Sequence, residues 1–385
     1  MNILNVLKFS PTVGGGIVQH LDVLGRVVKS SGHKLLIAFP KKRDWQAELE
    51  TISEVIIIPA IENPFRSGFP AILRKLCNDK KIDVVHFHFY FSLPFSLAFS
   101  LKKWDLPVIQ HWHNPPAALN DFLTPPDKVK GQLKRIGAGL IARFTDRRVI
   151  NRHISISHEI STLLVKNGWT DKRKITLLPN GVPVITYKDK DLKSKMTSTP
   201  IIGMVANFRP QKDHFTLLMA FNILFKSKIQ SELWLVGDGP TKPEIETLSK
   251  KLGVDSRIRF LGTISNPSEV YSKFDIFVLS SHFEGHPLVA LEAMSFGLPI
   301  VATRISGIQE TITHNVNGFL VKPRDPQDLA EALKKLLADQ SLAKRLGEEA
   351  RKSLAKYPSI NDWCNQVLEI YKDVIWSYYK TGPVL

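Results

Sequence analysis

Short apolar runs alternate with stretches of helical spacing along most of the chain. After the first apolar run, for example, Ile17, Leu21, Leu24 and Val28 recur at the period of an amphipathic helix. The strand-like runs are residues 2–9, 34–39, 55–58, 83–88, 107–111, 153–156, 174–178, 200–206, 232–236, 258–261, 275–279, 299–302 and 318–321. This alternation favours an α/β fold in which helices cover both faces of a parallel sheet.

The alternation pauses at residues 186–199, which are polar, rich in lysine and without apolar periodicity. We therefore predict two Rossmann-like, doubly wound domains, residues 1–185 and 200–360, that face each other across a cleft. Residues 361–385 are predicted to be helical, and this helix either packs back on the N-terminal domain or is a plain terminal helix. Ligands of such sheets bind at the carboxyl ends of the strands, so we seek the chemistry in the loops after strands.

Charge is the informative part of the composition. The 385 residues carry a formal net charge of +16, which predicts an anionic partner such as a phosphate-bearing substrate or an anionic membrane surface. No nucleic-acid-binding motif is visible, so nucleic acid is not expected. The first residues do not resemble a secretory signal, no apolar run approaches about 18 residues, and a cytoplasmic protein is expected. Cys77 and Cys364, far apart in sequence, are expected to be reduced packing residues.

The most specific segment is Ser280–Met294, directly after the strand-like run 275–279. Its sequence places Glu284 in a loop at the end of a strand and Glu292 inside the helix that follows. Pro287 suits the first helical turn, where free backbone N–H groups bind phosphate oxygens. We therefore predict a substrate site at this loop that also includes Gly285, His286, Pro287 and Leu288.

The two glutamates with seven residues between them, followed by Ala293–Val301, resemble the signature of glycosyltransferase family 4. The order of further segments is similar too: residues 14–16, 179–182, 212–213 and 236–240. The resemblance implies a retaining enzyme with the two-domain GT-B fold. It also implies that Glu284 contacts hydroxyls of the donor sugar and that Glu292 binds the ribose of the nucleotide.

Two cations follow the strand-like run that opens the second half. Lys212 matches the phosphate-binding lysine of the family, and it could neutralise a diphosphate leaving group. The arginine common in the family stands five residues before that lysine, where this chain has Asn207. Arg209 is three residues before Lys212, so whether Arg209 or Asn207 takes the arginine's role stays open.

In the first half, Gly14, Gly15 and Gly16 stand between a strand-like run and a helix, so the backbone there could approach a phosphate or an acceptor. We take Gly15 and Gly16 as substrate-binding candidates. The segment 110–116 also follows a strand, and the resemblance suggests that His113 touches the donor sugar. His111 is expected to belong to the strand itself.

No metal and no cofactor are predicted for the reaction. Asp189-Lys190-Asp191 has the spacing with which the other major glycosyltransferase fold holds a divalent ion, but it lies in the polar linker. We interpret it as solvated charge, and we expect cations of the protein to replace a metal at the diphosphate.

Two segments bear on the acceptor. Residues 86–91 alternate histidine with aromatic residues, which fits either the binding of a lipid tail or the packing of a central strand. Residues 127–152 carry many basic residues with apolar ones between them. They fit either a basic helix on an anionic membrane or an ordinary solvated face.

The sequence thus predicts transfer of a hexose-type sugar from a nucleotide diphosphate sugar, with UDP favoured over GDP, to an acceptor hydroxyl. A saccharide or lipid-linked saccharide of surface-polysaccharide synthesis is the expected acceptor. Two other functions stay open: a nucleotide-sugar epimerase of the same fold, and a non-catalytic nucleotide-binding protein.

Overall fold

The structure is a computed structural model of the 385-residue chain. It describes residues 1–8, 16–62, 68–89, 97, 101, 104–115, 140, 143–144, 146–182, 199–264 and 268–381. The chain divides into two compact units, one of Met1–Gly181 with Pro358–Leu385 and one of Val182–Tyr357. The end of the first segment at Gly181 and the end of the second unit at Tyr357 lie within four residues of the expected limits, 185 and 360, whereas the second unit begins at Val182 and not at residue 200. Residues 358–360 are part of the first unit.

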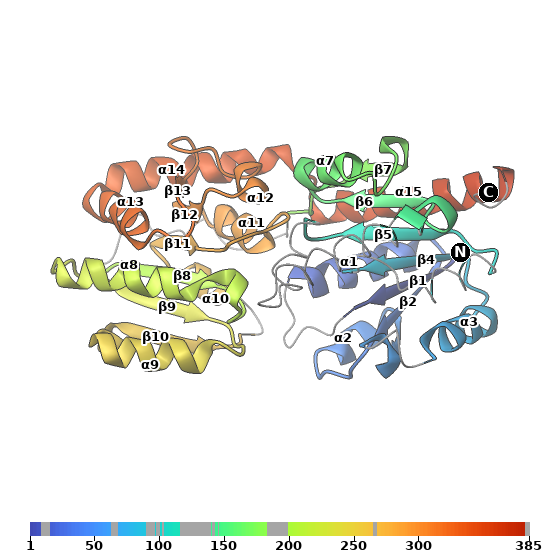
Figure 1. The fold of residues 1–385 in the computed structure, drawn as a ribbon, viewed down its shortest axis with the longest axis horizontal. Helices are drawn as coiled ribbons and strands as arrows, with labels where there is room; N and C mark the ends of the chain where they lie inside the picture. The colour runs from blue at the N-terminus through green and yellow to red at the C-terminus, as the bar shows by residue number, and fades with distance from the viewer. Residues whose placement is uncertain are drawn as a thin grey trace. The chain divides into compact units, whose positions relative to one another are not determined.

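The first unit is built on a seven-stranded parallel sheet in the order β3-β2-β1-β4-β5-β6-β7 (Figure 1). Its strands are β1 (Asn2–Leu7), β2 (Lys34–Phe39), β3 (Glu54–Ile57), β4 (Val84–His88), β5 (Val108–Trp112), β6 (Arg152–Ser155) and β7 (Ile175–Leu177). Its helices include α1 (Gly16–Ser30), α2 (Gln46–Glu50), α3 (Phe69–Asp79), α7 (His158–Lys166) and α15 (Ile360–Thr381). The unit also has two short 3₁₀ turns, η1 (Pro59–Ile61) and η2 (Lys172–Lys174).

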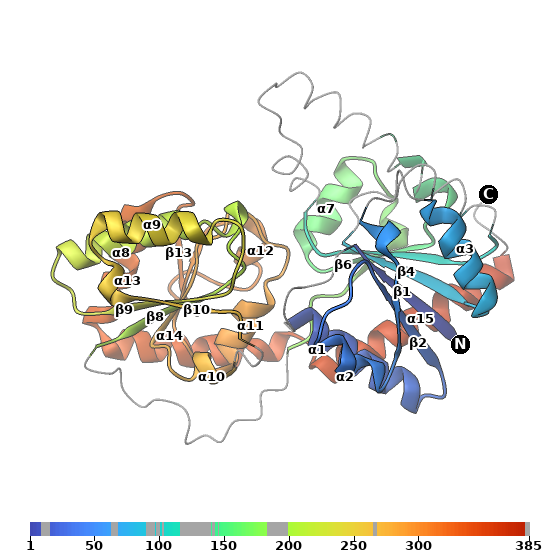
Figure 2. The ribbon, with the colours of Figure 1, turned by 90° about the horizontal axis from the view of Figure 1, so that it is seen from below.

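Helices cover both faces of this sheet (Figure 2). Helix α1 presents Leu21, Leu24 and Val28 to a core that also contains Val367 and Tyr371 of α15. Helices α3 and α7 pack on the opposite face, in separate apolar clusters. The last helix of the chain, red in Figure 1, is therefore part of the core of the first unit.

The second unit has a six-stranded parallel sheet in the order β10-β9-β8-β11-β12-β13. Its strands are β8 (Ile201–Val205), β9 (Glu232–Val236), β10 (Ile258–Gly262), β11 (Ile276–Leu279), β12 (Ile300–Thr303) and β13 (Phe319–Val321). Its helices are α8 (His214–Lys226), α9 (Lys242–Leu252), α10 (Ser268–Tyr271), α11 (Leu288–Ser295), α12 (Ser306–Gln309), α13 (Pro326–Ala338) and α14 (Gln340–Ser353), with the 3₁₀ turns η4 (Pro210–Lys212), η5 (Asp255–Arg257) and η6 (Leu354–Lys356). Helices α8, α9 and α13 lie on one face, and α10 and α11 lie on the other (Figure 2).

The predicted α/β class and the doubly wound order of both sheets are confirmed. Each strand-like run of the sequence overlaps a strand whose bounds lie within two residues of the predicted ones. Buried parallel strands are apolar on both faces, which is why short continuous apolar runs located them. Both cysteines are buried, as expected of packing residues, and neither is part of a disulfide. No helix among the described residues is both long and apolar enough to cross a bilayer.

Strand order reverses direction once in each sheet, between β1 and β4 in the first unit and between β8 and β11 in the second. At such a switch point the connections leave toward opposite faces, and a crevice opens beyond the carboxyl ends of the two strands. In the second unit, Lys212 follows β8 and Glu284 follows β11. The fold therefore brings the two segments singled out in the sequence to one edge of the sheet.

Candidate functional site

An ion pair joins the two loops at the switch point of the second sheet. Lys212 ends the turn η4, and its Nζ lies 2.5 Å from Oε1 of Glu284. The Glu284 side chain is 8% exposed and the Lys212 side chain 19% exposed. Two residues that are 72 apart in sequence thus place a cation and a carboxylate side by side, at a point that solvent partly reaches.

Asp213, the next residue after Lys212, anchors this loop through its side chain. This residue has a left-handed backbone (φ 49°), and its carboxylate caps α8 by accepting from Thr216 N and from Thr216 Oγ1. Its Oδ2 also lies 2.8 Å from Nε2 of His282, in the β11 loop. Burial alone would raise the pKa of Asp213, but hydrogen bonds with His282 and Thr216 outweigh it, so the pKa is lowered. An ionised Asp213 therefore links the two loops.

Glu284 is positioned by its own loop and by neighbouring chain segments. Ser281 Oγ donates to Glu284 Oε1 at 2.6 Å, and Gln211 Nε2 donates to the Phe283 carbonyl at 2.8 Å. A Cβ added to Gly307 at α12 would lie 2.1 Å from the Glu284 carbonyl oxygen, so only glycine allows this close approach. These contacts fix the position of the Glu284 side chain and of its loop.

Helix α11 follows the loop, with Pro287 at its N-cap. Gly285, His286 and Pro287 are buried, and Leu288 is half-buried. Glu292 lies inside the helix and is 5% exposed, and its Oε2 accepts from the Tyr271 hydroxyl at 2.7 Å. Burial raises the pKa of Glu292 although the bond from Tyr271 opposes it. The predicted placement of Glu284 in a loop and Glu292 in a helix is confirmed, and the roles of both remain predictions.

Asn207 and Arg209 stand on either side of a buried phenylalanine, Phe208, and both are exposed. Phe208 N donates to the Asp238 carbonyl at 2.9 Å. A Cβ on Gly237 would meet the Ala206 carbonyl oxygen at 2.1 Å, so the loop after β9 packs tightly on the loop after β8. Both candidates for the arginine's role therefore project from a firmly held loop, and the choice between them stays open.

His214 gives the first testable prediction. Its ring is buried, stacks on Phe208 at 4.0 Å, and burial lowers its pKa to about 3, with Lys212 adding to the shift. In the unfolded chain the His214 imidazole takes up a proton near pH 6.5, whereas in the folded chain it stays neutral until about pH 3. The contribution of a neutral His214 to the free energy of unfolding is therefore fully present above pH 6.5 and is lost as the pH falls toward 3. Relative to a His214→Leu variant, wild type should lose about 1.4 kcal/mol of unfolding free energy per pH unit between pH 6 and pH 4. Urea unfolding of both proteins measures this, and identical pH dependence in the two would contradict it.

In the first unit, Gly16 is the first residue of α1, and Gly15 lies outside the described residues. His113 follows β5, is half-buried, and its Nε2 lies 3.1 Å from Nδ1 of His88. Its ring stacks on Phe89 at 4.0 Å and on His111 at 4.2 Å. Burial, with the nearby His88 and His20, holds the pKa of His113 well below its usual range, so His113 is a neutral hydrogen-bonding group at pH 7.

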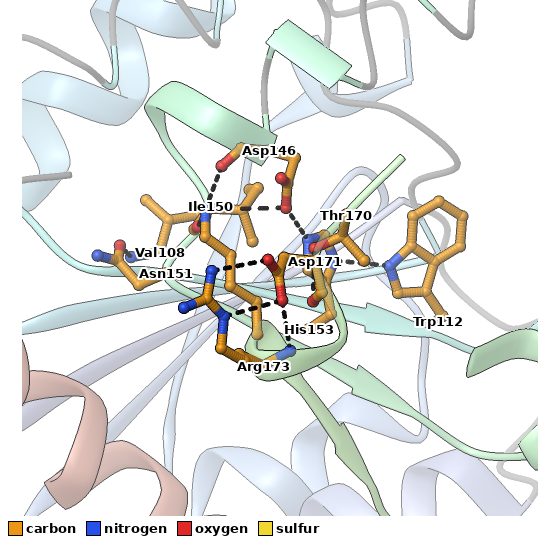
Figure 3. Close-up of polar contacts among 10 residues, drawn as sticks. Val108, Trp112, Asp146, Ile150, Asn151, His153, Thr170, Asp171 and Arg173 are labelled. Atoms are coloured by element: carbon orange, nitrogen blue, oxygen red, sulfur yellow. Dashed lines mark hydrogen bonds and ion pairs between the residues drawn. The ribbon is translucent and has the colours of Figure 1, made fainter. Parts of the chain in front are cut away.

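A buried polar network fixes the strand end that carries His113 (Figure 3). The indole N–H of Trp112 donates to His153 Nδ1 at 2.9 Å, and His153 Nε2 lies 2.8 Å from Asp146 Oδ1. Because Nδ1 accepts, the proton of a neutral His153 is on Nε2 and points at Asp146. Lys174 Nζ donates to the carbonyls of Asp146 and Ile150. The network ties β5, β6 and the segment before β6 together.

The structure also brings together residues that the sequence reading did not select. Ser281 donates to Glu284 in its own loop, Tyr271 donates to Glu292, and His282 pairs with Asp213. The partners of Tyr271 and His282 lie on other elements, so no local pattern marks these two residues. His111 is within β5, as predicted, and stacks with His86 and Trp363. Asp189-Lys190-Asp191 and most of the basic segment 127–152 lie outside the described residues.

Family models match both halves of the chain. The model described as Glycosyltransferase Family 4 matches residues 14–184, and the one described as Glycosyl transferases group 1 matches residues 181–353. The second match contains Lys212, Glu284 and Glu292. This chain belongs to glycosyltransferase family 4.

Curated relatives and solved structures agree with this family. The chain is 35% identical over 178 residues to N-acetyl-alpha-D-glucosaminyl L-malate synthase of Bacillus anthracis, a match of 46% of each chain. It is 28% identical over 311 residues to D-inositol 3-phosphate glycosyltransferase of Corynebacterium urealyticum, covering 76% of this chain and 72% of the relative. The match thus spans about half of the length of the first relative and 72% of the length of the second.

Among solved structures, sucrose-phosphate synthase of Thermosynechococcus elongatus superposes with a TM-score of 0.81 at 20% identity, over 98% of this chain and 100% of that one. HepE of Anabaena in complex with UDP-glucose gives a TM-score of 0.75 at 18% identity, over 96% and 99%. At these identities the likeness concerns the fold, which is the predicted GT-B fold.

Proposed function

We propose that this family 4 protein transfers a hexose-type sugar from a nucleotide diphosphate sugar, with UDP favoured, to an acceptor hydroxyl, with retention of the anomeric configuration. The observation that carries the proposal is the Lys212–Glu284 pair at the carboxyl ends of β8 and β11, beside the first turn of α11. The complex of the fold relative HepE with UDP-glucose and the names of the curated glycosyltransferases support the donor class.

In this proposal the ion pair opens when the donor binds. A diphosphate brings more negative charge than one carboxylate, so the Lys212 ammonium exchanges Glu284 for phosphate oxygens. Glu284 then accepts hydrogen bonds from hydroxyls of the donor sugar, still held by Ser281. The backbone N–H groups at the start of α11 add a second positive site for the phosphates.

The reaction needs no protein nucleophile. The bond between the anomeric carbon and the phosphate oxygen breaks, and the acceptor oxygen bonds to the same face of the sugar. The acceptor proton passes to an oxygen of the departing phosphate. Lys212 and the N-terminus of α11 stabilise the charge that grows on the diphosphate, so no metal is needed at that position.

Glu292 is proposed to bind the ribose. Its Oε2 is committed to Tyr271, so the other carboxylate oxygen is the one offered to a ribose hydroxyl. The acceptor is proposed to be a saccharide or lipid-linked saccharide in surface-polysaccharide synthesis, reached at an anionic membrane surface on the cytoplasmic side. The net charge of +16 favours such a surface.

Product analysis tests the proposal. The protein is incubated with radiolabelled UDP-glucose, UDP-galactose or UDP-N-acetylglucosamine, with and without a mixture of saccharide and lipid-linked acceptors. We expect label in an acceptor-dependent product with a retained anomeric configuration. Conversion of the donor to its epimer without acceptor would make the protein an epimerase, and tight binding with neither transfer nor hydrolysis would make it a binding protein.

A further inference from the structure

Two His-x-His segments, residues 86–88 and 111–113, lie at the carboxyl ends of the neighbouring strands β4 and β5. Strand β4 ends in His86-Phe87-His88, and β5 contains His111 opposite His88. Because side chains alternate along a strand, His86 and His88 lie on one face, and Phe87 lies on the other. That face is the one covered by α15, since Tyr371 contacts His86 and Trp363 stacks on His111.

The proton on His86 is set by its neighbours. The Tyr371 hydroxyl donates its single hydrogen to Asn5 Oδ1 at 3.1 Å, so it accepts from His86 Nδ1, 2.8 Å away. In a neutral imidazole the Nε2 of His86 then carries a bare lone pair. That atom is buried and has no hydrogen-bond partner among the described residues. Histidines that bind metals are oriented by an outer hydrogen bond of this kind on the second ring nitrogen.

The rings of His88 and His111 also carry unpaired nitrogens. His88 Nδ1 is engaged with His113 Nε2 at 3.1 Å, and within the described part of the chain its Nε2 has no partner, nor has either nitrogen of His111. The three side chains are at most 1% exposed. One ring nitrogen from each of His86, His88 and His111 lies within 4.8 Å of the other two. Each of the three rings thus has at least one unpaired nitrogen, and the rings lie together in one buried place.

We propose that His86, His88 and His111 bind one divalent transition-metal ion of the zinc type. Imidazole nitrogens favour zinc, cobalt, nickel and copper over magnesium and calcium. Tetrahedral Zn–N bonds put ligand nitrogens about 3.4 Å apart, so binding draws the rings together and also turns His86 and His111, whose planes are nearly parallel, toward a common point. Three protein ligands leave a fourth position for water or an anion.

This ion site is distinct from the pair Lys212 and Glu284, which belongs to the second unit. It does not depend on the proposed transfer reaction, in which protein cations serve the diphosphate. A bound ion would join the ends of β4 and β5 and satisfy buried nitrogens, so it should stabilise the native chain by mass action.

Metal binding to the untagged full chain tests the proposal. Protein stripped with a chelator and dialysed is equilibrated with ZnCl₂ at pH 7.5, and bound zinc is measured by elemental analysis. We expect one zinc per chain, a raised melting temperature, and with CoCl₂ the visible absorption of tetrahedral cobalt. His88→Gln and His111→Gln should each lower the affinity at least about 10-fold, and Tyr371→Phe, which touches no metal, by about 10-fold or more through the orientation of His86.

His158→Gln, at the exposed first position of α7, is the matched control and should bind as wild type does. The proposal is overturned if wild type takes up no zinc and gives no cobalt absorption. It is also overturned if the His88 and His111 variants keep the wild-type affinity. Should those variants not fold, the cobalt spectrum of wild type and the zinc affinity of the Tyr371→Phe variant decide.

Discussion

Replacing Lys212 by alanine should lower kcat for sugar transfer by about 10²- to 10³-fold, the effect of removing one group that stabilises a developing anion. The Lys212 ammonium lies beside Glu284 at the carboxyl ends of β8 and β11, where we place the diphosphate of the donor. The measurement is initial transfer rate at saturating donor and acceptor. Lys212→Arg should retain part of the rate, because the charge remains while its geometry changes.

Lys226→Ala supplies the matched control. Lys226 is exposed at the end of α8, so this substitution removes the same charge at a position away from the loop. Its rate should equal that of wild type. A Lys212→Ala variant that transfers sugar within about 3-fold of wild type would remove Lys212 from the mechanism. The alanine variant also leaves the buried Glu284 carboxylate without its cation, which destabilises the fold, and adding Glu284→Gln should restore stability without restoring the rate.

Glu284→Gln should lower kcat/KM for the donor sugar nucleotide by about 10- to 100-fold, the loss of hydrogen bonds to a charged acceptor. The amide has the size of the carboxylate, so Ser281 can still hold it and the loop is preserved. Affinity for the free nucleotide should change much less, because the predicted contact is with the sugar. Donor titrations of transfer and of UDP binding separate the two effects.

Glu244→Gln, at an exposed position in α9, removes a comparable charge elsewhere in the same unit and should leave both parameters unchanged. Equal losses of UDP affinity and of kcat/KM in the Glu284→Gln variant would place Glu284 against the nucleotide. An unchanged kcat/KM would show that the carboxylate only supports the loop.

The alternation of apolar runs and helical spacing was enough to predict both sheets, because parallel strands buried on both faces are marked by composition alone. The loop position of Glu284 and the helical position of Glu292 followed from the strand before them and from Pro287. The side chains that contact the two glutamates could not be predicted from the sequence in this way. The Lys212–Glu284 pair joins residues 72 apart, and the hydrogen-bond donor to the buried Glu292 carboxylate is Tyr271, 21 residues before it.

The histidines show a different limit. His86 and His88 alternate with aromatic residues, and a central buried strand gives the same pattern as a ligand site. The burial is as core packing predicts, yet the free nitrogens of His86, His88 and His111 are visible only when β4, β5 and α15 are assembled. Hydrogen-bond satisfaction is a tertiary property, and no spacing along one strand reports it.

Calorimetric titration of wild type and a Glu292→Gln variant with UDP tests the central claim, that the second unit binds the nucleotide at the edge formed by β8, β11 and α11. Wild type should bind one UDP per chain more tightly than GDP or ADP. The variant, which keeps a partner for Tyr271 but loses a charged acceptor for the ribose, should bind UDP about 10-fold more weakly. Absence of nucleotide binding to wild type, or equal UDP affinity in both proteins, would contradict the account.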